Sequence, residues 1–252
     1  MGKIIAITNQ KGGVGKTTTA INLSAGVAEL SGKVLLMDMD PQGNATSGLG
    51  QAGLGHGSIY DALIEGVALE ELIIKTEHFG LDMVVSDINL AGAEIELVDL
   101  PEREGRLRAA LSEIRGRYDY IFIDCPPSLS LLTLNALAAA DGMLIPIQCE
   151  YFALEGVGQL MNTLNLVNQR LNRRLEVSGI LLTMLDGRTN LSNQVAEEVR
   201  KHFGQKVFET TIPRNVRLSE APSHGLPIGS YDPRCPGGLA YQALALELIG
   251  RE

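Results

Sequence analysis

The sequence has few of the residues that mark extracellular or membrane proteins. It contains no tryptophan, 4% aromatic residues and three cysteines in 252 residues. Cys125, Cys149 and Cys235 are odd in number and far apart, which excludes a disulfide framework and indicates reduced, buried thiols. The apolar run at 131–147 is interrupted by polar residues, so no segment offers the roughly 20 apolar residues of a membrane span. Because the N-terminus lacks a secretory leader pattern, we predict a cytoplasmic protein.

Positive charge is scarce overall but is concentrated in one region. The net charge of −9 excludes a surface coated with basic residues, although it does not exclude a local basic patch. Residues 170–235 contain ten Lys and Arg against seven Asp and Glu. Any contact with a polyanion is therefore expected in the C-terminal third.

Short apolar runs alternate with longer helical patterns along the whole chain. The runs predict strands at 3–8, 34–38, 81–86, 120–124, 142–148, 177–184 and 207–212. The helical patterns lie at 16–30, 106–115, 131–139, 154–171 and 190–203. Almost continuously apolar strands are typical of a sheet that helices cover on both faces. We predict one α/β domain spanning residues 1–252, with a doubly wound, mostly parallel sheet of about seven or eight strands flanked by helices.

The first predicted strand leads into a glycine-rich loop, NQKGGVGKTT at 9–18, and then into a helix. This context is the one a P-loop requires, because backbone N–H groups and the helix N-terminus then surround phosphate oxygens. Lys16 is expected to reach the β- and γ-phosphates, and the Thr17 hydroxyl to bind Mg²⁺. The loop residues expected to contact ATP are Lys11, Gly12, Gly13, Val14, Gly15, Lys16, Thr17 and Thr18.

The loop departs from the ordinary P-loop in one respect. Gln10 stands where the first glycine is usual, and a second lysine, Lys11, follows it. The run KGGVGKT resembles the deviant Walker A motif of the ParA/MinD superfamily, and the likeness to its ParA/Soj members extends over essentially the whole chain. This resemblance implies an ATPase in which Lys11 reaches the nucleotide of a partner subunit, so that ATP drives homodimerisation. Such a cation would act on the transferring phosphoryl group as an arginine finger does.

Acidic residues end two of the predicted strands. Asp38 and Asp40 end the second strand, where alternation places them on one face. By resemblance, Asp40 orients the attacking water, and Asp38 is a magnesium neighbour or a structural residue. The strand YIFID ends at Asp124 as a Walker B motif does, so Asp124 is expected to hold Mg²⁺ together with Thr17 and Asp40. Lys11, Lys16 and Asp40 are thus the predicted catalytic residues.

Two further stretches resemble the same family, at 181–189 and 211–222. By resemblance, Met184 and the turn from Pro213 to Asn215 line the adenine.

The basic candidates for contacts to nonspecific double-stranded DNA are Arg188, Arg200, Lys201, Lys206, Arg217 and Arg234. The resemblance also implies a nucleoid-associated ATPase with slow hydrolysis. A ParB-type centromere-binding protein is the expected partner and would stimulate this hydrolysis. Because the first predicted strand begins at residue 3, we expect no separate N-terminal DNA-binding domain.

Three alternatives remain at this point. A MinD-like ATPase would bind a membrane, but the tail GLAYQALALELIGRE contains one cation, Arg251, which is too little charge for anionic lipid. A relative of the nitrogenase iron protein would need paired cysteines with local motifs that Cys125 and Cys149 lack. A nucleotide-gated interaction module with incidental hydrolysis would have no need of the full set of Lys16, Thr17, Asp40 and Asp124.

Overall fold

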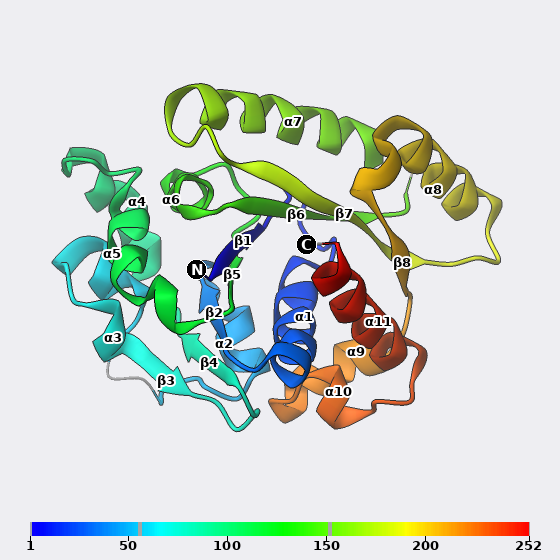
Figure 1. Cartoon of the computed structure of the whole chain (residues 1–252), viewed down its shortest axis with the longest axis horizontal. Coiled ribbons are helices and arrows are strands. Elements are labelled where there is room, and N and C mark those ends of the chain that lie inside the picture. Colours follow the sequence, from blue (N-terminus) through cyan, green and yellow to red (C-terminus); the bar gives the residue numbers. More distant parts are fainter. Residues whose placement is uncertain (1, 55–56, 151–152, 252) are drawn as a thin grey trace.

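A single eight-stranded sheet runs through the molecule (Figure 1). The computed structural model describes residues 2–54, 57–150 and 153–251, without the side chains of residues 153–157, 159 and 160. The strand order is β3-β4-β2-β5-β1-β6-β7-β8, and β3 is antiparallel to β4 while the other pairs are parallel. The strands are β1 (Lys3–Ile7), β2 (Val34–Asp38), β3 (Ile73–Lys75), β4 (Leu81–Val84), β5 (Tyr120–Asp124), β6 (Gly142–Gln148), β7 (Glu176–Leu185) and β8 (Val207–Pro213).

Helices cover both faces of this sheet, as the apolar strands require. The longer helices are α1 (Lys16–Ser31), α4 (Leu90–Glu96), α5 (Arg106–Ile114), α6 (Leu131–Ala139), α7 (Ala153–Arg170), α8 (Asn190–Phe203) and α11 (Pro236–Gly250). The short ones are α2 (Asn44–Gly48), η1 (Asp61–Glu65), α3 (Leu69–Leu72), η2 (Leu97–Asp99), η3 (Arg115–Arg117), η4 (Gly204–Lys206), α9 (Arg217–Glu220), η5 (Ala221–His224) and α10 (Ile228–Tyr231).

Two apolar cores form because alternate strand residues point to opposite faces of the sheet. Ile4 and Ala6 of β1 pack with buried residues of α4 to α8, whereas Ile5 and Ile7 pack with those of α1 and α11. Figure 1 shows α6, α7 and α8 on one side of the central strands and α1 with α11 on the other. The predicted doubly wound, mostly parallel sheet is confirmed.

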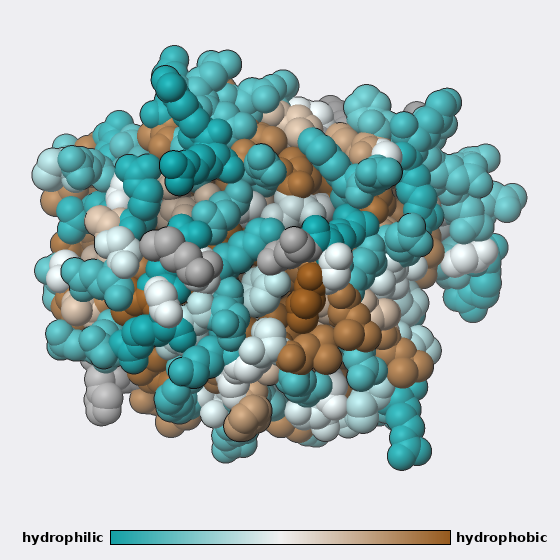
Figure 2. All heavy atoms as spheres, viewed as in Figure 1, coloured by the Kyte–Doolittle hydropathy of each residue, from teal (hydrophilic) through white to brown (hydrophobic). Residues whose placement is uncertain are grey.

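The C-terminal helix α11 belongs to the second core. Its residues Leu244, Ala245 and Leu248 are buried, and Tyr241 donates to or accepts from the Thr19 hydroxyl of α1 at 3.1 Å. Leu239 and Leu246 remain exposed on its outer side. On the face seen in Figure 2, hydrophilic residues cover most of the surface, and hydrophobic residues gather over the region of α1 and α11. Among the described residues, no helix has both the length and the apolar character needed to cross a membrane.

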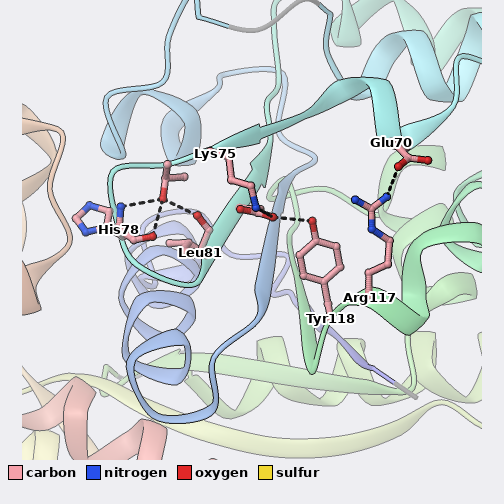
Figure 3. Close-up of polar contacts among 8 residues, drawn as sticks. Glu70, Lys75, His78, Leu81, Arg117 and Tyr118 are labelled. Carbon is pink, nitrogen blue, oxygen red and sulfur yellow. Dashed lines mark hydrogen bonds and ion pairs between the residues drawn. The ribbon is translucent and has the colours of Figure 1, made fainter.

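The edge strand β3 was not predicted from the sequence. Its three residues are too few to show the alternating pattern of a strand. Polar contacts to and around the neighbouring strand β4 help to hold it in place (Figure 3). Lys75 and the Tyr118 hydroxyl both donate to the carboxylate of Asp82, each at 2.9 Å. Nearby, Arg117 donates to Glu70 at 2.6 Å, which fixes α3 beside the turn before β5.

Replacing Tyr118 with phenylalanine is expected to lower the free energy of unfolding by about 1 kcal/mol, because a largely buried hydrogen bond to Asp82 is lost. Burial raises the pKa of Tyr118, so its hydroxyl stays a donor at neutral pH. Lys75→Ala is the control, since its ammonium is mostly solvated and should contribute less than about 0.5 kcal/mol. Urea unfolding of the two variants measures the difference; equal values would contradict it.

Candidate nucleotide-binding site

The glycine-rich loop lies between the carboxyl end of β1 and the start of α1. Gly13 and Gly15 have φ values of 72° and 88°, a left-handed conformation that glycine adopts without strain. The side-chain amide of Asn9 donates to the carbonyl of Pro146 at 2.7 Å, and its oxygen accepts the backbone N–H of Lys11 at 3.0 Å. The Thr183 hydroxyl donates to the carbonyl of Val14 at 2.8 Å. Neighbouring strands therefore hold the loop open at the start of a helix, where an anion is favoured.

Lys16 is the first residue of α1 and is almost completely buried, with 6% of its surface exposed. Its ammonium donates to the carbonyl of Lys11 at 3.1 Å. Burial lowers the pKa of Lys16, while the nearby Asp124, Cys125 and Asp40 raise it in opposition. A bound phosphate would add a further charge partner that favours the protonated form of this buried lysine.

Lys11 differs from Lys16 because its side chain remains 38% exposed. Its ammonium lies 3.5 Å from the Glu150 carboxylate, which also accepts a hydrogen bond from the Gln148 side chain. The sequence analysis did not identify Glu150, because no local motif indicates that the residue after β6 contacts the glycine-rich loop. The two P-loop lysines thus have different surroundings, one enclosed and one facing outward.

Asp124 ends β5 between the ends of β1 and β2, with Ile7 and Asp38 as its partners across the two ladders. Both carboxylate oxygens are buried, and among the described residues neither has a hydrogen-bond partner of standard geometry. Burial raises the pKa of Asp124 well above its ordinary value, and the Asp38 charge adds to this, whereas the Thr17 hydroxyl and Lys16 lower it. The hydroxyl of Thr17 and this carboxylate are the oxygen donors that Mg²⁺ prefers, so the residues fit a hydrated magnesium ion.

Asp38 is buried and acts within the protein. One of its oxygens accepts the backbone N–H and the hydroxyl of Thr46, both at 2.8 Å, and the other accepts the N–H of Asp40 at 3.1 Å. Burial raises the pKa of Asp38 to about 6, although the hydrogen bonds from Thr46 and Asp40 lower it. These contacts correspond to the structural role that was one of its two predicted roles.

Asp40 lies just beyond the end of β2 and is 8% exposed. Its carboxylate accepts the backbone N–H of Gln42 at 3.0 Å, and its carbonyl accepts the Ser86 hydroxyl at 2.7 Å. The N–H of Ser86 in turn donates to the Thr46 hydroxyl at 3.0 Å. Ser86 and Thr46 therefore fix the loop that carries Asp40, a function that the sequence did not indicate. The glycine-rich segment that follows Asp40 forms α2 at Asn44–Gly48, and residues 55 and 56 lie outside the described residues.

A cleft of about 380 Å³ adjoins the glycine-rich loop. It brings together the three residues predicted to line the base, namely Met184, Pro213 and Asn215, with Gly15 and Thr18. Met184 has a φ of 52°, which is unusual for a residue other than glycine and indicates a strained backbone. Tyr241 of α11 also lines this cleft and was not predicted from the sequence.

The basic candidates for DNA contacts are divided between two edges of the sheet. Arg188 follows β7 and Arg217 follows β8, so both lie at the carboxyl edge with the glycine-rich loop. Lys201 lies in the last turn of α8 and Lys206 directly precedes β8, which places them toward the opposite edge. There Lys206 and Arg200 line a groove with the first residues of β7. The structure therefore places these four candidates at two separate edges of the sheet.

At the carboxyl edge both arginines are held by acidic residues. Arg188 is 89% exposed and donates two hydrogen bonds to Asp186, at 2.9 and 2.8 Å. Arg217 donates to Glu220 at 2.7 Å and lies 3.5 Å from Asp232. Both guanidinium groups are near the surface, where a phosphate can compete with these carboxylates.

Comparisons with known proteins agree with this geometry. The family model described as an AAA domain matches residues 2–177. The sporulation initiation inhibitor protein Soj of Bacillus subtilis is 58% identical over 249 residues, with 98% of each chain covered. The chromosome partitioning protein ParA of Myxococcus xanthus is 57% identical, covering 100% of this chain and 89% of the relative.

A solved structure gives the same fold. Cobyrinic acid a,c-diamide synthase of Mycobacterium smegmatis, with bound ADP and magnesium, is 36% identical with a TM-score of 0.86 over 99% of this chain and 94% of that one. The chain that contains this glycine-rich loop, buried lysine and acidic strand ends thus matches its relatives over nearly their full length. The chain belongs to the Soj/ParA family of chromosome-partitioning ATPases.

Proposed function

We propose that the protein is an ATPase that dimerises on ATP, binds DNA without sequence preference in that state and acts in chromosome partitioning. The observation that carries this proposal is the meeting of Lys16, Thr17 and Asp124 beside an outward-facing Lys11 at one edge of the sheet. A relative solved with ADP and magnesium supports the nucleotide, and the names of other relatives, chromosome partitioning protein ParA and chromosome-partitioning ATPase Soj, support the partitioning role.

In this function the protein binds and orients the nucleotide through groups that are already in place. Loop N–H groups and Lys16 would hold the phosphates, and Met184, Pro213 and Asn215 would enclose the base. Magnesium, held by Thr17 and through water by Asp124, supplies charge neutralisation when bound. Asp40 would accept a proton from, and orient, the water that attacks the γ-phosphate.

We propose that Lys11 acts on the nucleotide of a second copy, which requires a dimer. Its exposed position on the loop allows it to leave Glu150 and to reach the phosphates of a second copy. A cation added in this way stabilises the transferring phosphoryl group only when two molecules meet. We propose that a ParB-type partner stimulates this slow hydrolysis and so limits the lifetime of the dimer.

The charge distribution favours one face for DNA. Residues 61–113 contain thirteen Asp and Glu against four Lys and Arg, a difference equal to the whole net charge of −9. They lie around β3, β4, α4 and α5, on the opposite side of the sheet order from β7 and β8 (Figure 1). Phosphates would be repelled there, and Arg188 and Arg217 would meet them in a dimer that doubles each contact. This surface would place the protein on the nucleoid.

The test is binding of a short duplex DNA of random sequence, measured by fluorescence anisotropy with ATP and with ADP. We expect binding only with ATP, its loss in Lys16→Ala, and binding at least about tenfold weaker in Arg188→Ala, with a smaller dependence on salt. Lys206→Ala is the matched control at the opposite edge and should change affinity by less than about twofold. Equal binding with ATP and ADP, or anionic vesicles bound in place of DNA, would contradict the proposal.

A further inference from the structure

The segment from Asn215 to Tyr231 begins at the base cleft and packs against α1. Asn215 lines the base cleft, and the Asn22 side chain of α1 accepts the N–H of Ile228 at 2.6 Å. Arg217 lies near the beginning of this segment and is one of the two arginines that we assign to DNA. A displacement of the segment would therefore move a DNA contact.

The loop after β2 is tied to Asp38 and Asp40 by the hydrogen bonds of Thr46 and Ser86. Thr46 belongs to α2, so a movement of the acidic strand end on nucleotide binding would carry α2 with it. The turn that follows α2 contains Gly50, with a φ of 69°.

Gly50 meets Gly225 at the end of η5. A Cβ atom added to Gly225 would lie 3.0 Å from the Cα of Gly50 and 3.2 Å from its nitrogen. Both neighbouring atoms are backbone, so they cannot move aside as a flexible side chain would. Pro222 completes the contact, because a Cβ atom on Gly48 would lie 3.6 Å from the Cβ of Pro222. The turn after α2 and η5 are thus packed backbone against backbone.

The contact is rigidly linked to Arg217. Gly225 donates its N–H to the carbonyl of Pro222 at 3.1 Å, and η5 continues directly from α9, which begins at Arg217. Glu220, in the same α9, holds the guanidinium of Arg217 and accepts a hydrogen bond from the Tyr231 hydroxyl at 3.3 Å. Arg217 must leave Glu220 and Asp232 before it can pair fully with a phosphate.

We propose that the contact between Gly50 and Gly225 couples the nucleotide site to DNA binding by positioning α9 and releasing Arg217 from Glu220. Gly50 and Gly225 are positioning residues, since they touch neither nucleotide nor DNA. This coupling rests on the proposed ATP-dependent DNA binding. It describes how the nucleotide site would affect Arg217. By reciprocity, DNA bound to Arg217 would also stabilise the ATP-bound arrangement of α2.

The test is Gly225→Asn with Gly53→Asn as the matched control. Asparagine tolerates positive φ, and Gly53 has a φ of 76° with no atom of the described residues within 4 Å of an added Cβ, so only Gly225→Asn should disturb a described contact. We expect both variants to bind a fluorescent ATP analogue within about twofold of the unmodified protein, and Gly225→Asn alone to lose at least about tenfold of the ATP-dependent DNA affinity. The coupling is overturned if the two variants bind DNA alike, or if Gly225→Asn loses nucleotide binding as well.

Glu220→Gln provides an independent measurement on an exposed pair that is not needed for folding. Weakening the restraint on Arg217 is expected to raise DNA affinity with ADP and so to reduce the ratio of the ATP and ADP affinities by at least about threefold. An unchanged ratio would overturn the release of Arg217. If the unmodified protein itself bound DNA equally with ATP and ADP, the proposed function would fail, a result that is separate from a failure of the coupling.

Discussion

Asp40→Ala is expected to lower ATP hydrolysis by about 100-fold or more while ATP-dependent DNA binding persists or increases. The carboxylate lies beside the predicted phosphate position, and its backbone is fixed by Ser86, so removing the side chain removes the group that orients water but leaves the loop in place. Because hydrolysis ends the ATP state, a variant that cannot hydrolyse ATP should accumulate as the DNA-binding form. Phosphate release at saturating ATP and DNA, together with anisotropy on the same samples, measures both effects.

The control for this variant is Glu77→Ala, which removes an exposed carboxylate from the β3–β4 turn. Its hydrolysis rate should equal that of the unmodified protein within about twofold. A rate for Asp40→Ala near that of Glu77→Ala would assign water orientation to another group. Loss of DNA binding together with hydrolysis would indicate that Asp40 is required to bind ATP.

Asp124→Asn is expected to abolish hydrolysis and, in the absence of nucleotide, to raise the free energy of unfolding by roughly 1–3 kcal/mol. The carboxylate is buried and has no hydrogen bond of standard geometry to the part of the chain that the structure describes, and Asp38 lies close enough to raise its pKa. A neutral amide of nearly the same shape removes that unfavourable charge. It also removes the magnesium partner, so stability and activity should change in opposite directions.

The pH dependence of this effect has a definite sign. A carboxyl whose pKa is raised in the folded state binds more protons there than in the unfolded chain, so its presence lowers the free energy of unfolding as the pH rises. Asp124→Asn lacks this group, and its advantage should be largest at high pH and shrink toward pH 4. Urea unfolding at several pH values measures it. A variant less stable than the unmodified protein at pH 8 would mean that the Asp124 charge is compensated in the folded state.

The sheet could be predicted from the sequence because its central strands are almost wholly apolar. The strands at 34–38, 120–124 and 142–148 were predicted with the boundaries that the structure has. The edge strand β3 and the short helices α9 and α10 were missed because their stability comes from tertiary contacts such as those of Asp82 and Asn22. Local patterns contain no information about those partners.

The site was predictable to the extent that its residues lie in one short motif or end a strand. Lys16, Thr17 and Asp124 follow from a loop and a strand whose order fixes their meeting at one edge. Glu150, Ser86 and Tyr241 belong to distant segments, and only the folded chain shows that they touch Lys11, the Asp40 loop and the base cleft. The basic candidates could not be placed from the sequence, because only the direction of the strands shows that Arg188 and Lys206 lie at opposite edges of the sheet.

The proposed ATP-driven dimerisation can be tested by measuring the molar mass of Asp40→Ala by light scattering, with ATP and magnesium, and comparing it with that of Asp40→Ala/Lys11→Ala. We expect a dimer of about 54 kDa for the single variant, twice the 27.0 kDa of one chain, and a monomer for the double variant. A monomer for Asp40→Ala at saturating ATP, or a dimer that does not require Lys11, would contradict it.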